Sequence, residues 1–329
     1  MSECILVNAP SRLHFGLFGG ESHHGTSFGG VGAMIDEPGI ELQLSPSSKR
    51  IYAGQQVSRL QAFTEQWIQF VGIQPESEVR IELKQAAGSH IGLGTGTQLG
   101  LSVAAALFQH YYEEIPGIDQ LALSVQRGKR SAVGTHGFLH GGLIVDRGKK
   151  ESDALAQMDL HLPFPPGWCF VLIKTAADQG LSGAAEDTVF DSNWTGTSHR
   201  RRELVELAQS VMVPAILNSD FAGFSQSIQR FGELSGDYFS RIQGGPYNGP
   251  RITEMVDKIR RCDVDGVGQS SWGPTVYALL PSRVEANLFM DQLGEYLLPN
   301  EWMTVAIPSE NGAAVRVCCE KQSSNGIDL

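Results

Sequence analysis

A glycine-rich loop in front of an apolar helix is the feature that most constrains how this chain can fold. The loop Gly92-Leu93-Gly94-Thr95-Gly96-Thr97-Gln98 lies between a predicted strand and an almost continuously apolar stretch from Leu99 to Leu107. A helix that is apolar on most sides must be buried, so this stretch is predicted to cross the core. The start of such a helix presents backbone N–H groups without intrahelical partners, which predicts a phosphate-sized anion site at the loop. The alternative is an ordinary tight turn.

The loop matches neither of the two common phosphate-binding motifs. No Gly-Lys-Ser/Thr follows it, which excludes a P-loop, and no glycine stands three residues after Gly96, which excludes a dinucleotide fingerprint. Glycine is nevertheless abundant, with 38 residues where average usage of ~7% would give roughly 23. Since glycine is concentrated in loops, the functional site is expected there.

The periodicity of the chain favours an α+β fold of two domains. Ile40–Leu44 and Val79–Leu83 alternate apolar and polar residues, as half-buried antiparallel strands do, and apolar residues from Val57 to Phe70 recur at helical spacing between them. A charged segment with three prolines, 146–166, is predicted to link residues 1–150 to residues 151–329. The second half mixes strands and helices without a regular βαβ rhythm, which argues against a doubly wound sheet. Its predicted strands are 168–173, 275–280, 302–307 and 314–318, and its predicted helices are 202–213, 221–231, 252–261 and 283–297.

Charge and composition exclude several classes of protein. The net charge of −11 opposes nucleic-acid binding, because the only short basic cluster is Arg200-Arg201-Arg202. The longest apolar stretches are far shorter than the ~20 residues that span a bilayer. Five cysteines without a Cys-x-x-Cys pair predict reduced thiols, and the first eight residues lack a signal-peptide pattern, so a cytoplasmic protein is expected.

Two further segments carry candidate binding residues. Ser11, Arg12 and His14 lie on a predicted strand, where Arg12 and His14 share one face and together suit a phosphate or a carboxylate. The alternative is a strand edge with Arg12 in a surface ion pair. The segment Gly266–Pro274 offers the amide, hydroxyl and indole groups that could hold a polar aromatic ligand, and its alternative is a turn with a packed indole. Those groups belong to Gln269, Ser270, Ser271 and Trp272.

His136 and His140 have the spacing of two metal ligands on one helix. Four glycines surround them, which makes a helix that would align the two imidazoles unfavourable. The sequence therefore predicts no metal site here. The surrounding glycines are Gly134, Gly137, Gly141 and Gly142.

Taken together, the motifs resemble those of the GHMP superfamily, named for its galactose, homoserine, mevalonate and phosphomevalonate kinases. The resemblance implies a ribosomal-protein-S5-like N-terminal domain and a ferredoxin-like C-terminal domain. Within the superfamily, the string Gln-Ser-Ser-Trp-Gly-Pro is similar to that of the beta-ribofuranosylaminobenzene 5'-phosphate synthase family and is absent from the kinases. The matching segments are Ser11–Leu17, Gly92–Gln98, Arg130–Phe138 with Gly141-Gly142, and Gly268–Thr275.

The resemblance implies a homodimeric, Mg²⁺-dependent enzyme of tetrahydromethanopterin biosynthesis. Such an enzyme joins 4-aminobenzoate to phosphoribosyl pyrophosphate, releasing CO₂ and pyrophosphate. The expected catalytic residues are Arg12, His14, Arg130 and His136, of which the first three are expected to supply positive charge. The expected substrate-binding residues are Ser11, Gly92, Gly94, Thr95, Gly96, Thr97, Gln98, Gln269, Ser270, Ser271 and Trp272. The residues that would hold the metal cannot be assigned from the sequence.

Two other functions remain open at this point. One is an ATP-dependent small-molecule kinase that uses the glycine loop for nucleotide phosphates. Against it, Gly134-Thr135-His136 stands where some kinases of the superfamily place a catalytic Asp. The other is a ligand-binding protein without catalysis.

Overall fold

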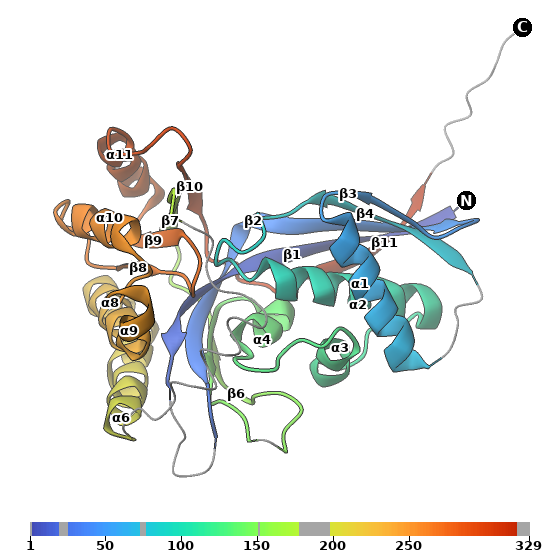
Figure 1. Ribbon diagram of the computed structural model, residues 1–329, viewed down its shortest axis with the longest axis horizontal. Coiled ribbons are helices and arrows are strands. Elements are labelled where there is room, and N and C mark those ends of the chain that lie inside the picture. Colours follow the sequence, from blue (N-terminus) through green and yellow to red (C-terminus); the bar gives the residue numbers. More distant parts are fainter. Residues whose placement is uncertain (1, 20–25, 73–76, 151, 178–197, 321–329) are drawn as a thin grey trace, which may run out of the picture.

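Two β-sheets, each covered by helices, make up the described part of the chain (Figure 1). The computed structural model describes residues 2–19, 26–72, 77–150, 152–177 and 198–320. The α+β class expected from the sequence is confirmed, because antiparallel strand pairs dominate both sheets.

The first sheet has the strand order β11-β1-β2-β4-β3, with β5 paired to β2 and β6 paired to β5. The two strands predicted from alternation are confirmed as an antiparallel pair, in which Leu42 lies opposite Leu83. Each is part of a longer strand than its alternating stretch indicates. The strands are β1 (Ser2–Leu17), β2 (Gly30–Ser47), β3 (Ile51–Gly54), β4 (Glu78–Gln85), β5 (Leu143–Asp146), β6 (Met158–Leu162) and β11 (Ala314–Glu320).

Four helices pack beside this sheet (Figure 1): α1 (Val57–Val71), α2 (Thr95–Tyr112), α3 (Ile118–Ser124) and α4 (Val133–His140). The predicted burial of the apolar stretch after the glycine loop is confirmed, because every residue of α2 from Gln98 to Phe108 is buried. The expectation that glycines prevent a helix around His136 is wrong. Gly137 lies against Met34 so closely that a Cβ there would meet the Met34 sulfur at 2.2 Å, so glycine lets α4 pack on β2.

The second sheet has the order β10-β7-β9-β8 and the chain order βαββαβ of a ferredoxin-like domain. Its strands are β7 (Cys169–Lys174), β8 (Val267–Gln269), β9 (Thr275–Leu280) and β10 (Trp302–Ala306). The helices of this half are α6 (Ser198–Leu207), a π-helical turn (Ala208–Met212), α7 (Val213–Leu217), α8 (Phe221–Gly236), a 3₁₀ turn (Asp237–Phe239), α9 (Ser240–Gln243), α10 (Pro250–Arg260) and α11 (Arg283–Gly294).

The first sheet takes strands from both sides of the division expected at residue 150. Strand β6 lies within the segment predicted to be a linker, and β11 returns from the end of the chain to pair with β1. A shared core also joins the two halves, in which the Phe15 ring lies 5.3 Å from Tyr277 and 6.1 Å from Phe170. The junction of the two sheets is therefore closely packed where Phe15 of β1 contacts Phe170 and Tyr277 of the second sheet.

Candidate active site

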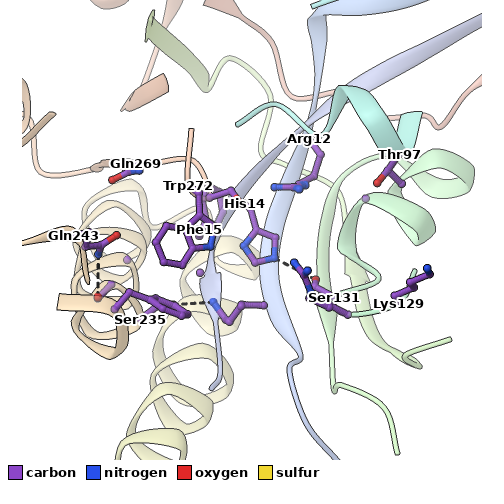
Figure 2. Close-up of a pocket in the computed structure, with 18 of the residues that line it drawn as sticks. Arg12, His14, Phe15, Thr97, Lys129, Ser131, Ser235, Gln243, Gln269 and Trp272 are labelled. Carbon is purple, nitrogen blue, oxygen red and sulfur yellow. Dashed lines mark hydrogen bonds between the residues drawn. The ribbon is translucent and has the colours of Figure 1, made fainter. Parts of the chain in front are cut away.

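A cavity of about 400 Å³ opens at this junction. Strand β1, the loop before α4, the end of α8 and the loop after β8 all contribute to its wall (Figure 2). In the view of Figure 2, Arg12, Thr97 and Lys129 lie on one side of His14, and Trp272, Gln243 and Ser235 lie on the other. A smaller cavity of about 190 Å³ adjoins it and is lined by the glycine loop. Arg12, Thr97, Arg127, Ser271 and Trp272 line both.

One wall of the two cavities is cationic. Arg12, Arg127, Lys129 and Arg130 line the larger cavity, and Arg59 joins Arg12 and Arg127 in the smaller one. Burial, with the nearby charge of Arg59, lowers the pKa of Arg127 to about 10, which leaves its guanidinium charged at neutral pH. Among the residues that the structure describes, no Asp or Glu lines either cavity. The chain as a whole has a net charge of −11, so basic side chains without carboxylates beside them make these walls a local site that favours anions.

Two glycines of the glycine loop lie too close to neighbouring atoms to carry a side chain without a shift. Gly92 lies against the carbonyl of Ser270, which a Cβ would meet at 2.3 Å, and Gly94 has φ +69 with the Arg12 side chain about 3.1 Å from where its Cβ would be. The N–H groups of Thr97 and Gln98 donate to the carbonyl of Gly94 at 2.9 and 3.1 Å. Two donors at the start of α2 are therefore used within the turn, so an anion bound here would depend on the arginines as well.

His14 is buried in the wall of the larger cavity, between the two sides. Burial and the adjacent Arg12 guanidinium lower the pKa of His14 well below its usual value of 6.5. The expectation that His14 supplies positive charge is therefore wrong, because a buried imidazole beside a fixed cation is neutral at neutral pH. Its Nε2 lies 3.1 Å from the hydroxyl of Ser131.

Some side chains of the loop after β8 line the cavity, and others form hydrogen bonds that hold neighbouring segments together. Ser270 is fully buried, where its hydroxyl accepts from the N–H of His14 and donates to the carbonyl of Gly92. The Gln269 amide accepts from Asn248 N and donates to the carbonyl of Gly273. Ser271 is exposed, and Trp272 is 7% exposed with its ring 4.6 Å from Phe239. Of the four, Gln269, Ser271 and Trp272 line the larger cavity.

The structure brings together most but not all of the residues predicted for the site. Arg12, His14, Arg130 and the glycine-loop residues Gly92, Gly94, Thr95, Gly96 and Thr97 line one or both cavities. Four predicted residues do not line either cavity, because their side chains are buried and form hydrogen bonds to backbone carbonyls. Ser11 donates to Pro38 O, Gln98 donates to Gly134 O, Ser270 donates to Gly92 O, and His136 bonds to Ala156 O.

Sequence reasoning missed Arg59, Arg127 and Lys129. The segment Arg127-Gly128-Lys129-Arg130 could have pointed to two of them, since three of its four residues are basic and form a second basic cluster besides Arg200–Arg202. Arg59 gives no such signal, because it is a lone arginine on an amphipathic helix. Hydrogen bonds from Arg59 to Gln56 and Ser89 hold it against the glycine loop.

The described residues do not fit a protein-held magnesium ion. Mg²⁺ prefers carboxylate oxygens in octahedral geometry, and the described part of the chain holds no group of three or more His, Cys, Asp or Glu suited to a metal. The carboxylate behind the cavity wall, Asp146, is fully buried and accepts from Ser131, Ala132 and Gly148. A divalent cation would find cations and neutral groups along these walls.

Features outside the cavities bear on the other expectations. No helix in the described ranges is long and apolar enough to cross a membrane. In the basic cluster, Arg201 is buried and donates to the carbonyls of Gly19 and Phe28, so the three arginines do not form one surface patch. Cys169, Cys262 and Cys318 are free thiols.

Comparison with known proteins finds relatives that cover most of the chain at 26–28% identity. Residues 212–297 match the family described as GHMP kinases C terminal. The Beta-ribofuranosylphenol 5'-phosphate synthase of Archaeoglobus fulgidus is 28% identical over 298 residues, covering 85% of this chain and 88% of that protein. The protein of the same name from Methanothermobacter thermautotrophicus is 26% identical over 301 residues, covering 85% and 89%.

Solved structures confirm the two-domain fold expected from the motifs. Homoserine kinase from Cytophaga hutchinsonii superposes with a TM-score of 0.65 at 16% identity, covering 95% of this chain and 97% of that one. Mevalonate diphosphate decarboxylase from Staphylococcus aureus gives a TM-score of 0.66 at 12% identity, covering 96% and 98%. At these identities the likeness concerns the fold alone.

Proposed function

From the premise that this chain belongs to the enzyme family of the beta-ribofuranosylphenol 5'-phosphate synthases, we propose that it is a decarboxylating phosphoribosyltransferase. It joins a para-substituted benzoate to phosphoribosyl pyrophosphate and releases CO₂ and pyrophosphate.

The observation that carries this proposal is the division of the cavity into two unlike walls. Arginines and a lysine face one side without any described carboxylate, as a substrate with a phosphate and a pyrophosphate requires. Phe15, Leu17, Phe239, Tyr247 and Trp272 supply apolar and aromatic surface to the same cavity, as an aromatic acceptor requires.

The chemistry needs positioning more than proton transfer. The bond between ribose C1 and the pyrophosphate oxygen breaks, and the pyrophosphate leaves with that electron pair. The ring carbon that bears the carboxylate forms the new bond to C1, and the bond to CO₂ then breaks and returns its electrons to the ring. No proton leaves that carbon, so no strong general base is required there. Fixed cations beside the departing pyrophosphate lower the barrier because they stabilise its developing charge.

We propose 4-aminobenzoate as the acceptor, on the resemblance of the motifs. The name of the relatives, beta-ribofuranosylphenol 5'-phosphate synthase, favours a second candidate, because it specifies a phenol product, to which 4-hydroxybenzoate would correspond. The two acceptors differ only at the para substituent, so the same walls would serve either.

Three further expectations stay proposals. We propose that the protein is a homodimer and that it is located in the cytoplasm. Light scattering of the pure protein would test the dimer. We also propose Mg²⁺ as a requirement. Because the described walls do not fit a resident ion, the metal is proposed to enter as a complex with the pyrophosphate.

One assay separates the candidate functions. In one incubation, pure protein receives Mg²⁺, phosphoribosyl pyrophosphate and carboxyl-labelled 4-aminobenzoate or 4-hydroxybenzoate. In a parallel incubation it receives Mg²⁺, ATP and homoserine or mevalonate. Release of labelled CO₂ with one benzoate supports the proposal and identifies the acceptor. ADP formation without CO₂ would support a kinase instead, and neither product would support a ligand-binding protein.

A further inference from the structure

We propose that Asp146 and Ser131 are positioning residues that hold His14 in a single neutral tautomer, with the proton on Nε2 and the free lone pair on Nδ1. The inference rests on the proposed function for its substrate, while the tautomer itself rests on geometry alone. Asp146 lies outside the motif segments that indicate the function and Ser131 lies within one of them, but neither is among the site residues that the resemblance implies.

The hydrogen bonds around the Ser131 hydroxyl determine the direction of its own proton. Oγ of Ser131 lies 2.6 Å from Oδ2 of Asp146, which also accepts from Ala132 N at 2.9 Å, while Oδ1 accepts from Gly148 N at 2.9 Å. The two backbone N–H groups favour the ionised form of this carboxylate, and an ionised carboxylate only accepts. Ser131 therefore donates its single proton to Asp146.

The remaining partners of Ser131 must then donate to it. A hydroxyl has one donor and two acceptor sites, and Val133 N–H occupies one acceptor site at 3.3 Å. The other faces Nε2 of His14 at 3.1 Å, so Nε2 carries the proton (Figure 2). In a neutral imidazole the proton on Nε2 leaves Nδ1 as an acceptor.

An acceptor nitrogen at this point suits a hydroxyl and not a phosphate. Phosphate oxygens accept hydrogen bonds, so Nδ1 would repel them, whereas the arginines beside it attract them. His14 lies between the cationic wall and the side with Trp272 (Figure 2). In the proposed substrate the ribose connects the phosphates to the carbon that the ring attacks. A ribose hydroxyl is therefore the group assigned to Nδ1.

Nitrogen-15 NMR of the imidazoles tests the tautomer without any turnover, because two-bond correlations distinguish protonated from bare ring nitrogens. The His14 signals are identified by their loss in His14→Gln. At pH 7.5 the wild type should show Nε2–H with a bare Nδ1, and Ser131→Ala should show a mixture of the two tautomers. Ser227→Ala is the matched control, because it removes another buried serine hydroxyl, bonded to Phe224 O at 2.7 Å and outside the cavities, and should leave the His14 signals unchanged.

A wild-type His14 protonated on Nδ1 would overturn the proposal, and so would signals that are the same in Ser131→Ala. Phosphoribosyl pyrophosphate alone should move the Nδ1 resonance, whereas 4-aminobenzoate alone should not; the reverse result would overturn the assignment to ribose. If wild-type protein forms no ribosyl product, the proposed function fails while the tautomer result still stands.

Steady-state kinetics then test whether Ser131 and Asp146 position His14 or only stabilise the fold. Ser131→Ala should lower kcat/KM at least tenfold, Ser131→Thr should restore most of it, and Ser227→Ala should not change it. Asp146→Asn combined with Ser131→Ala should cost no more than the larger single effect, since both act through one hydroxyl. Fully additive losses would mean that Asp146 acts on the fold and not through Ser131.

Discussion

The backbone N–H of His14 donates to the hydroxyl of Ser270, 3.0 Å away and 256 positions later in the chain. The same hydroxyl donates to the carbonyl of Gly92 at 2.8 Å. One buried side chain thus connects strand β1, the glycine loop and the loop after β8. The two cavities meet where these three segments are joined, so their shape depends on this serine.

Replacing Ser270 by alanine should therefore affect both stability and binding. The substitution leaves a buried N–H and a carbonyl without their partner, and each unsatisfied buried group costs about 1–3 kcal/mol. We expect a matching decrease in the free energy of unfolding, measured by urea denaturation, and a higher KM for phosphoribosyl pyrophosphate. Ser271→Ala is the control, because that neighbouring serine is exposed and should change the stability by little. Equal stability of the two variants would show that the Ser270 bonds contribute nothing net.

The glycine loop should be sensitive to a single methyl group. Gly94→Ala adds a Cβ about 3.1 Å from the Arg12 side chain, in a backbone conformation that costs an L-residue roughly 1–2 kcal/mol. Gly72→Ala is the matched control, since Gly72 has φ +73 and nothing within 4 Å of its Cβ position. Both variants should lose similar stability, but only Gly94→Ala should weaken the binding of phosphoribosyl pyrophosphate by calorimetry. Unchanged affinity in the folded Gly94→Ala variant would remove the loop from the site.

The sequence predicts those parts of the molecule that local pattern determines. Alternation and helical spacing identify the β2–β4 pair, α1 and α2, because each buries one face or is buried throughout. Pairing across long distances leaves no such local signal, which is why β6 and β11 were not assigned to the first sheet. The glycines of α4 indicate a loop when considered alone, but their effect depends on Met34, which lies on another element.

Prediction of the site from the sequence is limited in the same way, because it also depends on tertiary contacts. Motif resemblance identifies the segments that form the cavities, but not which side chains face them. Ser11, Gln98, Ser270 and His136 belong to the matched motifs, yet their polar atoms bond to backbone carbonyls within the fold. Polar residues in a motif can support a site as well as line it, and only tertiary contacts distinguish the two roles.

Arg127, one of the residues that the sequence did not identify, gives a test of the cationic wall. Arg127 lines both cavities and its guanidinium lies 4.9 Å from the Phe63 ring, which fixes its position. A charge-assisted hydrogen bond is worth about 1.5–3 kcal/mol, so Arg127→Ala should lower kcat/KM by more than tenfold. Arg230→Ala removes an equal charge from an exposed ion pair with Glu203 and is the control. Wild-type kinetics in Arg127→Ala would assign this arginine to structure alone.

The lowered pKa of His14 predicts how stability depends on pH. Burial, and then the charge of Arg12, keep the folded imidazole neutral, whereas the unfolded chain binds a proton below pH 6.5. The unfolded state therefore holds more protons in this window, so His14 lowers the free energy of unfolding as the pH falls from 6.5 towards the folded pKa. Burial raises the pKa of Asp146 above its ordinary value of 3.8. Above pH 3.8 the folded state therefore binds more protons at this carboxyl than the unfolded state does, so Asp146 raises the free energy of unfolding as the pH falls, which is opposite to the effect of His14. Compared with His14→Gln, the wild type should lose more stability between pH 8 and pH 5; parallel curves in urea titrations would contradict this.

Trp272 has both a packing role and a binding role, and a conservative substitution separates them. Its ring lies edge-on to Phe239 at 4.6 Å, is 7% exposed and lines both cavities. An aromatic pair contributes about 0.5–1.5 kcal/mol beyond its buried area, so Trp272→Phe should lower stability modestly and raise the KM for 4-aminobenzoate by up to about tenfold. Trp67→Phe is the matched control, because Trp67 is 1% exposed, packs 5.3 Å from Phe108 and lies away from the cavities. It should lower stability and leave KM unchanged. If both variants lose stability with wild-type KM values, Trp272 belongs to the core alone and the acceptor ring binds elsewhere in the cavity.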